Sequence, residues 1–110
     1  YNKNTDKIIS ADLINKMKKN AVIINTARGG VVDSAALADA LNEGRIAGAG
    51  IDVLETEPPF DLNHPLINAK NTVITPHAAF ASKEALYLRA VMVFDNIDFW
   101  QKGTPRNLCS

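Results

Sequence analysis

The fold is decided by residues 46–53, whose sequence is IAGAGIDV. This run is almost entirely apolar and is bounded by polar residues, which is typical of a strand buried within a sheet. Its alanines and glycines leave space for a helix or a cofactor to approach the backbone closely. Short apolar runs at 21–26 (AVIINT) and 72–75 (TVIT) predict two further strands, and Pro76 ends the second of them.

Two helices are predicted, one before and one after the strand over 21–26. Ser10 is a suitable N-cap for a helix over 11–19, and Asp33 is a suitable N-cap for a helix over 34–43. Gly44 marks the end of the second helix. The helix over 11–19 has an acidic residue in its first turn and lysines in its last turn. This charge order is favourable for the helix dipole. Its apolar stripe is expected to consist of Leu13, Ile14 and Met17.

A longer helix is predicted from residue 82 to about residue 101. Its apolar residues follow each other in steps of four and three, and Gly103 and Pro105 end it. A helix of about 20 residues spans roughly 30 Å, which is longer than three short strands need for cover. We therefore expect it to pack against something beyond this sheet. The stripe consists of Leu86, Ala90, Val93, Ile97 and Trp100, widened by Val91 and Phe94.

Alternation of buried strands and helices predicts an α/β domain with a parallel sheet and right-handed crossovers. Ligands of such sheets bind beyond the carboxyl ends of the strands. Four residues of chemical interest fall at or just beyond those ends in the sequence, namely Arg28, Asp52, Glu57 and His77. We therefore expect them to meet at one edge of the sheet.

Together, these four residues could form one catalytic site. A carboxylate beside an imidazole stabilises the imidazolium form, which makes the histidine a good acid/base at neutral pH. An arginine can bind a substrate carboxylate with two hydrogen bonds and polarise a neighbouring carbonyl. Such a site suits proton transfer to a 2-oxo acid while an organic cofactor delivers hydride. Each residue also has a structural interpretation: Arg28 and Glu57 as solvated turn residues, Asp52 as a turn cap, and His77 as a structural histidine.

The remaining composition narrows the class of protein. The 110 residues carry twelve basic and twelve acidic side chains, so we expect neither a nucleic-acid nor a membrane partner. Cys109 is the only cysteine, which excludes an intrachain disulfide and a cysteine-cluster metal site. The absence of a long apolar run and the start at Tyr1 lead us to expect a cytoplasmic fragment of a longer protein. His64 lies in the polar loop over 55–71, and we expect it to be solvated or structural, since the sequence implies no partner for it.

Three blocks of the sequence resemble the signature blocks of the D-isomer-specific 2-hydroxyacid dehydrogenases. They are INTARGGVVD (24–33), GIDVLETEPP (50–59) and NTVITPHAAF (71–80), in the order and spacing of that family. The resemblance implies the second half of a Rossmann-type NAD-binding domain over residues 1–80. It also implies that the helix over 82–102 returns to a substrate-side domain, and that the protein is a homodimer.

The resemblance also implies roles for individual residues. Arg28 would bind the substrate carboxylate, His77 would be the acid/base, and Glu57 would pair with His77. Asp52 would contact the nicotinamide carboxamide. Backbone positions lining the nicotinamide would be Thr26, Ala27 and residues 77–80, which include Ala78, Ala79 and Phe80.

The sequence indicates the family more clearly than it indicates the substrate or the cofactor. The motifs TEPP, NHPL, AKN and GTPRN look most like those of glycerate dehydrogenases, also called hydroxypyruvate reductases, whereas HAAF is similar to D-lactate dehydrogenases. The acidic residue that binds the ribose is not found at the expected position, so NADP stays open beside NAD. The sequence also holds no G-x-G-x-x-G motif, and we therefore expect the chain alone to be inactive. A corepressor-like or an oligomerisation module of the same fold is the non-enzymatic alternative.

Overall fold

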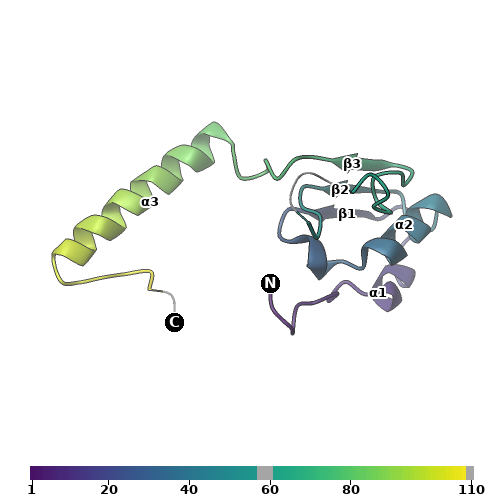
Figure 1. Ribbon diagram of the computed structural model, residues 1–110, viewed down its shortest axis with the longest axis horizontal. Coiled ribbons are helices and arrows are strands. Elements are labelled where there is room, and N and C mark those ends of the chain that lie inside the picture. The colour runs from purple at the N-terminus through teal and green to yellow at the C-terminus, as the bar shows by residue number, and fades with distance from the viewer. Residues whose placement is uncertain (57–60, 109–110) are drawn as a thin grey trace. The chain divides into compact units, whose positions relative to one another are not determined.

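The computed structural model describes residues 1–56 and 61–108. Contacts between residues divide the chain into two compact units, Tyr1–Ala78 and Ala79–Ser110. Figure 1 shows strands and short helices in the first unit and one long helix in the second. Glu57, Pro58 and Pro59 of the loop and Cys109 lie outside the described residues.

The first unit contains a parallel sheet of three strands in the order β1-β2-β3. The strands are β1 (Val22–Asn25), β2 (Gly48–Ile51) and β3 (Thr72–Ile74). Ile24 pairs with Gly50, which in turn pairs with Val73. The expected α/β fold with a parallel sheet is confirmed, and because the strands are parallel, their carboxyl ends meet at one edge.

Each strand is shorter than the sequence predicts. The residues that flank it form single backbone hydrogen bonds to the neighbouring chain but are not part of the regular strand pairing. The Ala47 N–H still donates to the Ala21 carbonyl at 2.9 Å, and the Asp52 N–H donates to the Asn25 carbonyl at 2.9 Å. Differences of one or two residues at the ends of an element are usual when the pairing fades gradually.

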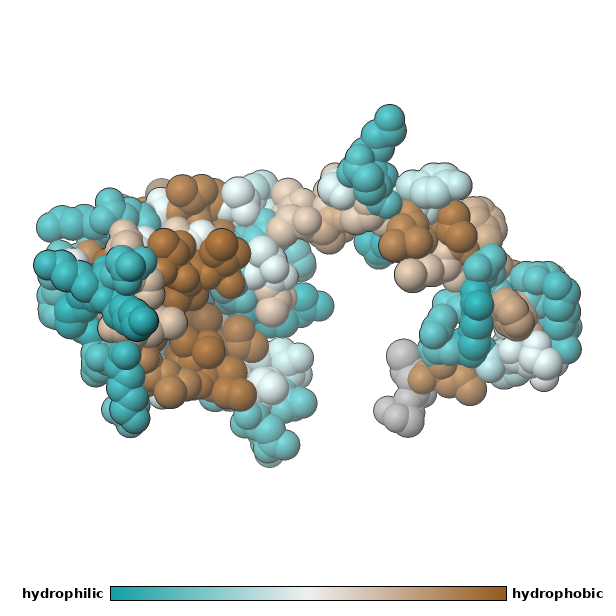
Figure 2. Space-filling view, turned by 180° about the vertical axis from the view of Figure 1, so that it is seen from behind, coloured by the Kyte–Doolittle hydropathy of each residue, from teal (hydrophilic) through white to brown (hydrophobic). Residues whose placement is uncertain are grey.

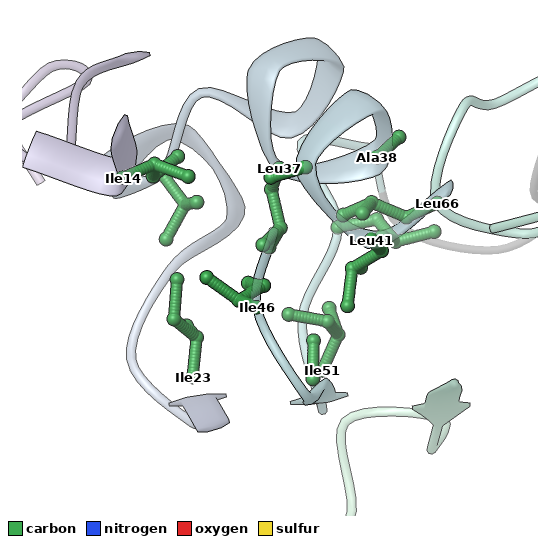
Figure 3. Packing of buried hydrophobic residues seen from close by; sticks show 12 residues of the cluster. Ile14, Ile23, Leu37, Ala38, Leu41, Ile46, Ile51 and Leu66 are labelled. Carbon is green, nitrogen blue, oxygen red and sulfur yellow. The ribbon is translucent and has the colours of Figure 1, made fainter. Parts of the chain in front are cut away.

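Helix α2 (Ser34–Asn42) covers one face of the sheet and agrees with its prediction. The Ala36 N–H donates to the Asp33 carboxylate at 3.2 Å, which is the predicted N-cap bond. Leu37 and Leu41 are completely buried, and Figure 3 shows them above Ile46 and Ile51 of the sheet layer. Gly44 has a φ of 69°, a left-handed conformation that suits a residue just after a helix.

Helix α1 (Ala11–Asn15) is shorter than predicted, and its stripe is narrower. The backbone N–H groups of Lys16 and Met17 donate to carbonyls three residues earlier, a tightening that ends the helix before the predicted lysine-rich turn. Ser10 is the N-cap by position, but its hydroxyl makes no capping bond. Ile14 is buried, whereas Leu13 and Met17 are exposed.

The predicted burial of the strands is confirmed for β2, but β1 and β3 each leave side chains exposed. Helices α1 and α2 pack on the same face, because Ile14 and Leu37 join one core cluster with Ile23. Side chains that point to the other face are therefore left uncovered. Ile24 is 75% exposed and Val73 is 66% exposed, and Figure 2 shows an apolar patch on this unit.

The second unit is built on helix α3 (Lys83–Gln101), close to the predicted range. The Ser82 hydroxyl accepts a hydrogen bond from the Ala85 N–H at 3.1 Å, and Gly103 has a φ of 73° just after the helix. None of the residues of α3 is buried, including the whole predicted stripe. Within the described ranges, α3 and the other helices are too short or too polar to cross a membrane.

We predict that Asp33→Ala lowers the free energy of unfolding by about 1 kcal/mol at neutral pH, the usual value of an N-cap. The hydrogen bond from the Ala36 N–H holds the pKa of Asp33 below its ordinary value. The cap is therefore at full strength above the pKa of the unfolded chain and is lost as the pH falls through the lower folded pKa. Urea denaturation at several pH values measures the difference, with Asp39→Ala on the same helix as control. A difference that does not shrink in acid would contradict the capping bond.

Candidate active site

The first loop at the carboxyl edge is organised by Asn25, the last residue of β1. Its buried side chain donates from Nδ2 to the Arg28 carbonyl at 2.9 Å and accepts at Oδ1 from the Ala27 N–H at 3.1 Å. These two bonds fix the loop that contains Thr26, Ala27 and Arg28. Asn25 is not among the sequence-predicted site residues. Its signal is a single polar side chain at the end of an apolar strand.

Arg28 is exposed after this loop and has an extended backbone. Its Nη1 donates to the Ala27 carbonyl at 2.6 Å. The 3-10 helix η1 (Gly29–Val31) follows directly. An added Cβ at Gly29 would lie 2.1 Å from the Leu54 carbonyl carbon and 2.3 Å from the Glu55 nitrogen. The backbone thus approaches the chain that leaves β2.

The second strand end carries Asp52, whose side chain is only 4% exposed. Its Oδ1 accepts hydrogen bonds from the Thr75 hydroxyl at 2.5 Å and from the Ala78 N–H at 2.8 Å. Its backbone carbonyl accepts from the His77 N–H at 2.9 Å. Asp52 therefore joins the end of β2 to the turn that follows β3.

His77 lies in that turn and is half-buried. Its φ is 54°, in the left-handed region that non-glycine residues adopt at an energetic cost. Its N–H is shared between the carbonyls of Asp52 at 2.9 Å and Thr75 at 3.0 Å. The surrounding hydrogen bonds thus hold a strained turn, which is a common property of functional sites.

The structure brings most of the predicted site residues to one edge of the sheet. Thr26, Ala27 and Arg28 follow β1, Asp52 follows β2, and His77 and Ala78 follow β3. Ala79 and Phe80 belong to the second unit, where the Arg89 guanidinium lies 5.7 Å from the centre of the Phe80 ring. Glu57, the predicted partner of His77, lies outside the described residues.

His64 is a structural histidine, one of the two roles expected for it, and it has a partner that the sequence did not imply. Its Nε2 lies 2.8 Å from Oε2 of Glu55. Burial acts to raise the pKa of Glu55, but hydrogen bonds with the Ser34 hydroxyl and the His64 ring, together with its own N–H, bring this pKa below its ordinary value. Glu55 had no predicted role, and sequence spacing gave no signal of a contact across nine residues.

In the part of the chain that the structure describes, no three His, Cys, Asp or Glu side chains gather around a possible metal ion. The carboxyl edge instead offers a guanidinium, an imidazole and backbone donors and acceptors. These groups can bind a carboxylate, exchange a proton and hydrogen-bond an amide. The parallel sheet with helices packed on it is an α/β fold of the Rossmann type, in which ligands bind at this edge.

The family follows from comparison with known proteins. The family model for "D-isomer specific 2-hydroxyacid dehydrogenase, NAD binding domain" matches residues 1–79. The chain therefore belongs to this family of NAD-dependent oxidoreductases.

Among the relatives is a glycerate dehydrogenase of Methylorubrum extorquens, 48% identical over 94% of this chain and 33% of its own length. A solved acyclic imino acid reductase in complex with NADPH and D-Arg is 34% identical, with a TM-score of 0.88 over 100% of this chain and 34% of its own. The NAD complex of a D-isomer specific 2-hydroxyacid dehydrogenase from Lactobacillus delbrueckii ssp. bulgaricus is 31% identical. Its TM-score is 0.80 over 100% of this chain and 37% of its own. The chain thus spans about a third of the length of each of these three proteins.

We predict that Gly29→Ala destabilises the loop around Arg28, because its methyl group would overlap with backbone atoms of Leu54 and Glu55. Gly50→Ala is the matched control, since its Cβ would meet only Ile24 Cγ1 at an ordinary 3.8 Å. Thermal unfolding should show a lower Tm for Gly29→Ala and a nearly unchanged Tm for Gly50→Ala. Equal Tm values for the two variants would contradict the close approach at Gly29.

Proposed function

We propose that the complete protein reduces a 2-oxo acid to a D-2-hydroxy acid with a nicotinamide cofactor, and that His77 is the proton donor. The observation that carries the proposal is the turn after β3. It is held by the buried Asp52 and carries His77 at the same sheet edge as Arg28. Families of shared fold differ in chemistry, so the assignment depends on these residues rather than on the fold alone.

Each residue has a chemical part in this proposal. The Arg28 guanidinium binds the substrate carboxylate and orients the neighbouring carbonyl group. The His77 imidazolium donates its proton to the carbonyl oxygen as negative charge develops there, and takes it back in the reverse direction. Glu57 stabilises the imidazolium form of His77 by its negative charge.

The cofactor would lie along the same edge. Residues proposed to line its nicotinamide are Thr26, Ala27, Arg28, Asp52, His77, Ala78, Ala79 and Phe80. The donor set fits a carboxamide, because backbone N–H and carbonyl groups and a carboxylate can satisfy both its oxygen and its nitrogen. The bound cofactor supplies the hydride that the side chains of the protein cannot provide.

We further propose the arrangement of the whole protein. Residues 1–80 would form the second half of the cofactor domain, and the helix over 82–102 would contribute to a substrate-side domain. Two copies would form a homodimer. The 110-residue chain alone would be inactive, since the G-x-G-x-x-G motif that binds pyrophosphate is not in its sequence.

Hydroxypyruvate is the proposed substrate, with D-glycerate as the product. The 48% identity to a glycerate dehydrogenase supports this choice. D-lactate dehydrogenases are the second candidate, because the HAAF sequence at 77–80 is similar to theirs, and a D-lactate dehydrogenase from Treponema pallidum is 32% identical with a TM-score of 0.77.

We predict that His77→Asn in the complete enzyme lowers kcat for hydroxypyruvate by about 10²–10⁴-fold, the usual contribution of a general acid. Stopped-flow and steady-state assays with NADH measure the rate, and NADH fluorescence checks that cofactor affinity is unchanged. Arg45→Lys is the control, since Arg45 pairs with the exposed Glu43 at 2.7 Å. The unmutated enzyme should have a lower kcat/KM for pyruvate than for hydroxypyruvate. A fully active His77→Asn enzyme would refute the assignment.

A further inference from the structure

We propose that Asn25 is a positioning residue for Arg28, the residue assigned above to the substrate carboxylate. The inference rests on the proposed function. Asn25 acts through the loop that carries Arg28 and does not touch the substrate itself. It is the buried last residue of β1, and two residues separate it from the exposed Arg28.

The backbone of Asn25 is held by the sheet. Asn25 pairs with Ile51 in the parallel register of β1 and β2. Its carbonyl accepts a hydrogen bond from the Asp52 N–H at 2.9 Å. Only 5% of the residue is exposed, so its amide group needs partners inside the protein to replace water. The side chain therefore starts from a fixed point at the carboxyl edge.

The loop supplies these partners with matching polarity. The Ala27 N–H donates to Oδ1 of Asn25 at 3.1 Å, and Nδ2 donates to the Arg28 carbonyl at 2.9 Å. A backbone N–H can only donate and a carbonyl can only accept, so the two partners also set the orientation of the amide. A carboxylate in this place would set an oxygen against the Arg28 carbonyl, and an aliphatic side chain would offer neither group. Asparagine provides the one donor and the one acceptor that this loop requires.

Both hydrogen bonds of the Asn25 amide lead to the Arg28 side chain. The Arg28 carbonyl, which accepts from Asn25, also accepts from the Val31 N–H at 3.3 Å, and this bond joins the loop to η1. Ala27, whose N–H donates to Asn25, accepts at its carbonyl from Nη1 of Arg28 at 2.6 Å. Asn25 thus fixes the main chain from which the arginine side chain leaves. The guanidinium itself rests on a residue that Asn25 holds.

This support matters because Arg28 is exposed. A long exposed side chain has many conformations, and binding a carboxylate with two hydrogen bonds requires a narrow set of them. A fixed starting point reduces the freedom that is lost when the substrate binds. Loss of the Asn25 bonds therefore weakens binding of the substrate carboxylate, whereas proton transfer from His77 is left in place.

The test is Asn25→Leu in the complete enzyme, because leucine keeps the size of the side chain and removes both hydrogen bonds. KM for hydroxypyruvate and Ki for oxamate, an unreactive 2-oxo acid analogue, should both rise about tenfold, less than the roughly hundredfold that a 1 Å displacement can cost. The kcat at saturating substrate and the Kd for NADH should stay nearly unchanged, since only binding of the carboxylate is weakened. Asn42→Ala is the matched control: the Asn42 side chain also accepts from a backbone N–H, that of Lys70 at 3.0 Å, but it lies at the end of α2.

The decisive comparison uses the Arg28→Ala background. If Asn25 acts through Arg28, Asn25→Leu should not raise KM further there, because the effects of coupled residues are not additive. An equal rise of KM in both backgrounds would overturn the positioning role and leave the proposed function intact. An Arg28→Ala enzyme with an unchanged KM would overturn the part of Arg28 in the proposed function, and the positioning role with it.

Asn25→Ala is the second variant, in case Asn25→Leu does not fold. Its smaller side chain leaves room for water beside the two backbone groups that lose their partner. KM for hydroxypyruvate should rise in this variant as well, and thermal unfolding shows whether each variant is folded. A folded Asn25→Leu or Asn25→Ala enzyme with the KM of the unmutated protein would contradict the proposal.

Discussion

The buried carboxylate of Asp52 is the constraint on which the rest of this sheet edge depends. Burial of a charged group is costly unless hydrogen bonds replace the lost water. Thr75 and Ala78 supply those bonds from the chain after β3. The same residue connects through its backbone to Asn25 at the end of β1. One residue thus links three strand ends, and His77 with its left-handed backbone lies between Thr75 and Ala78, the two residues that the Asp52 side chain contacts.

Close backbone packing extends this rigidity to the neighbouring loops. Gly29 allows the loop of Arg28 to contact Leu54, and the next residue, Glu55, reaches both α2 and His64. The loops that follow β1 and β2 are therefore fixed relative to each other by contacts away from the proposed reacting groups. Rigid support of this kind is what a site needs to hold a proton donor and a carboxylate-binding arginine in register.

Much of this architecture was predictable from local sequence signals. The strands, the cap at Asp33 and the stop at Gly44 depend on neighbouring residues, and so the sequence predicts them well. The early end of α1 and the open sheet face were not predictable, because they depend on which segments pack together. The convergence of Arg28, Asp52 and His77 followed from parallel topology. The bonds of Asn25 and the pair between Glu55 and His64 were not predictable, since nothing in residue spacing specifies a side-chain contact between loops.

The most direct test of the central claim is amide hydrogen exchange at Ala78, whose N–H donates to the Asp52 side chain rather than to the backbone. In the wild-type protein this amide should exchange slowly. Asp52→Asn, which keeps an acceptor oxygen, should preserve much of the protection, whereas Asp52→Ala should abolish it while the amides of α2 stay protected. Unchanged exchange at Ala78 in Asp52→Ala would contradict the account.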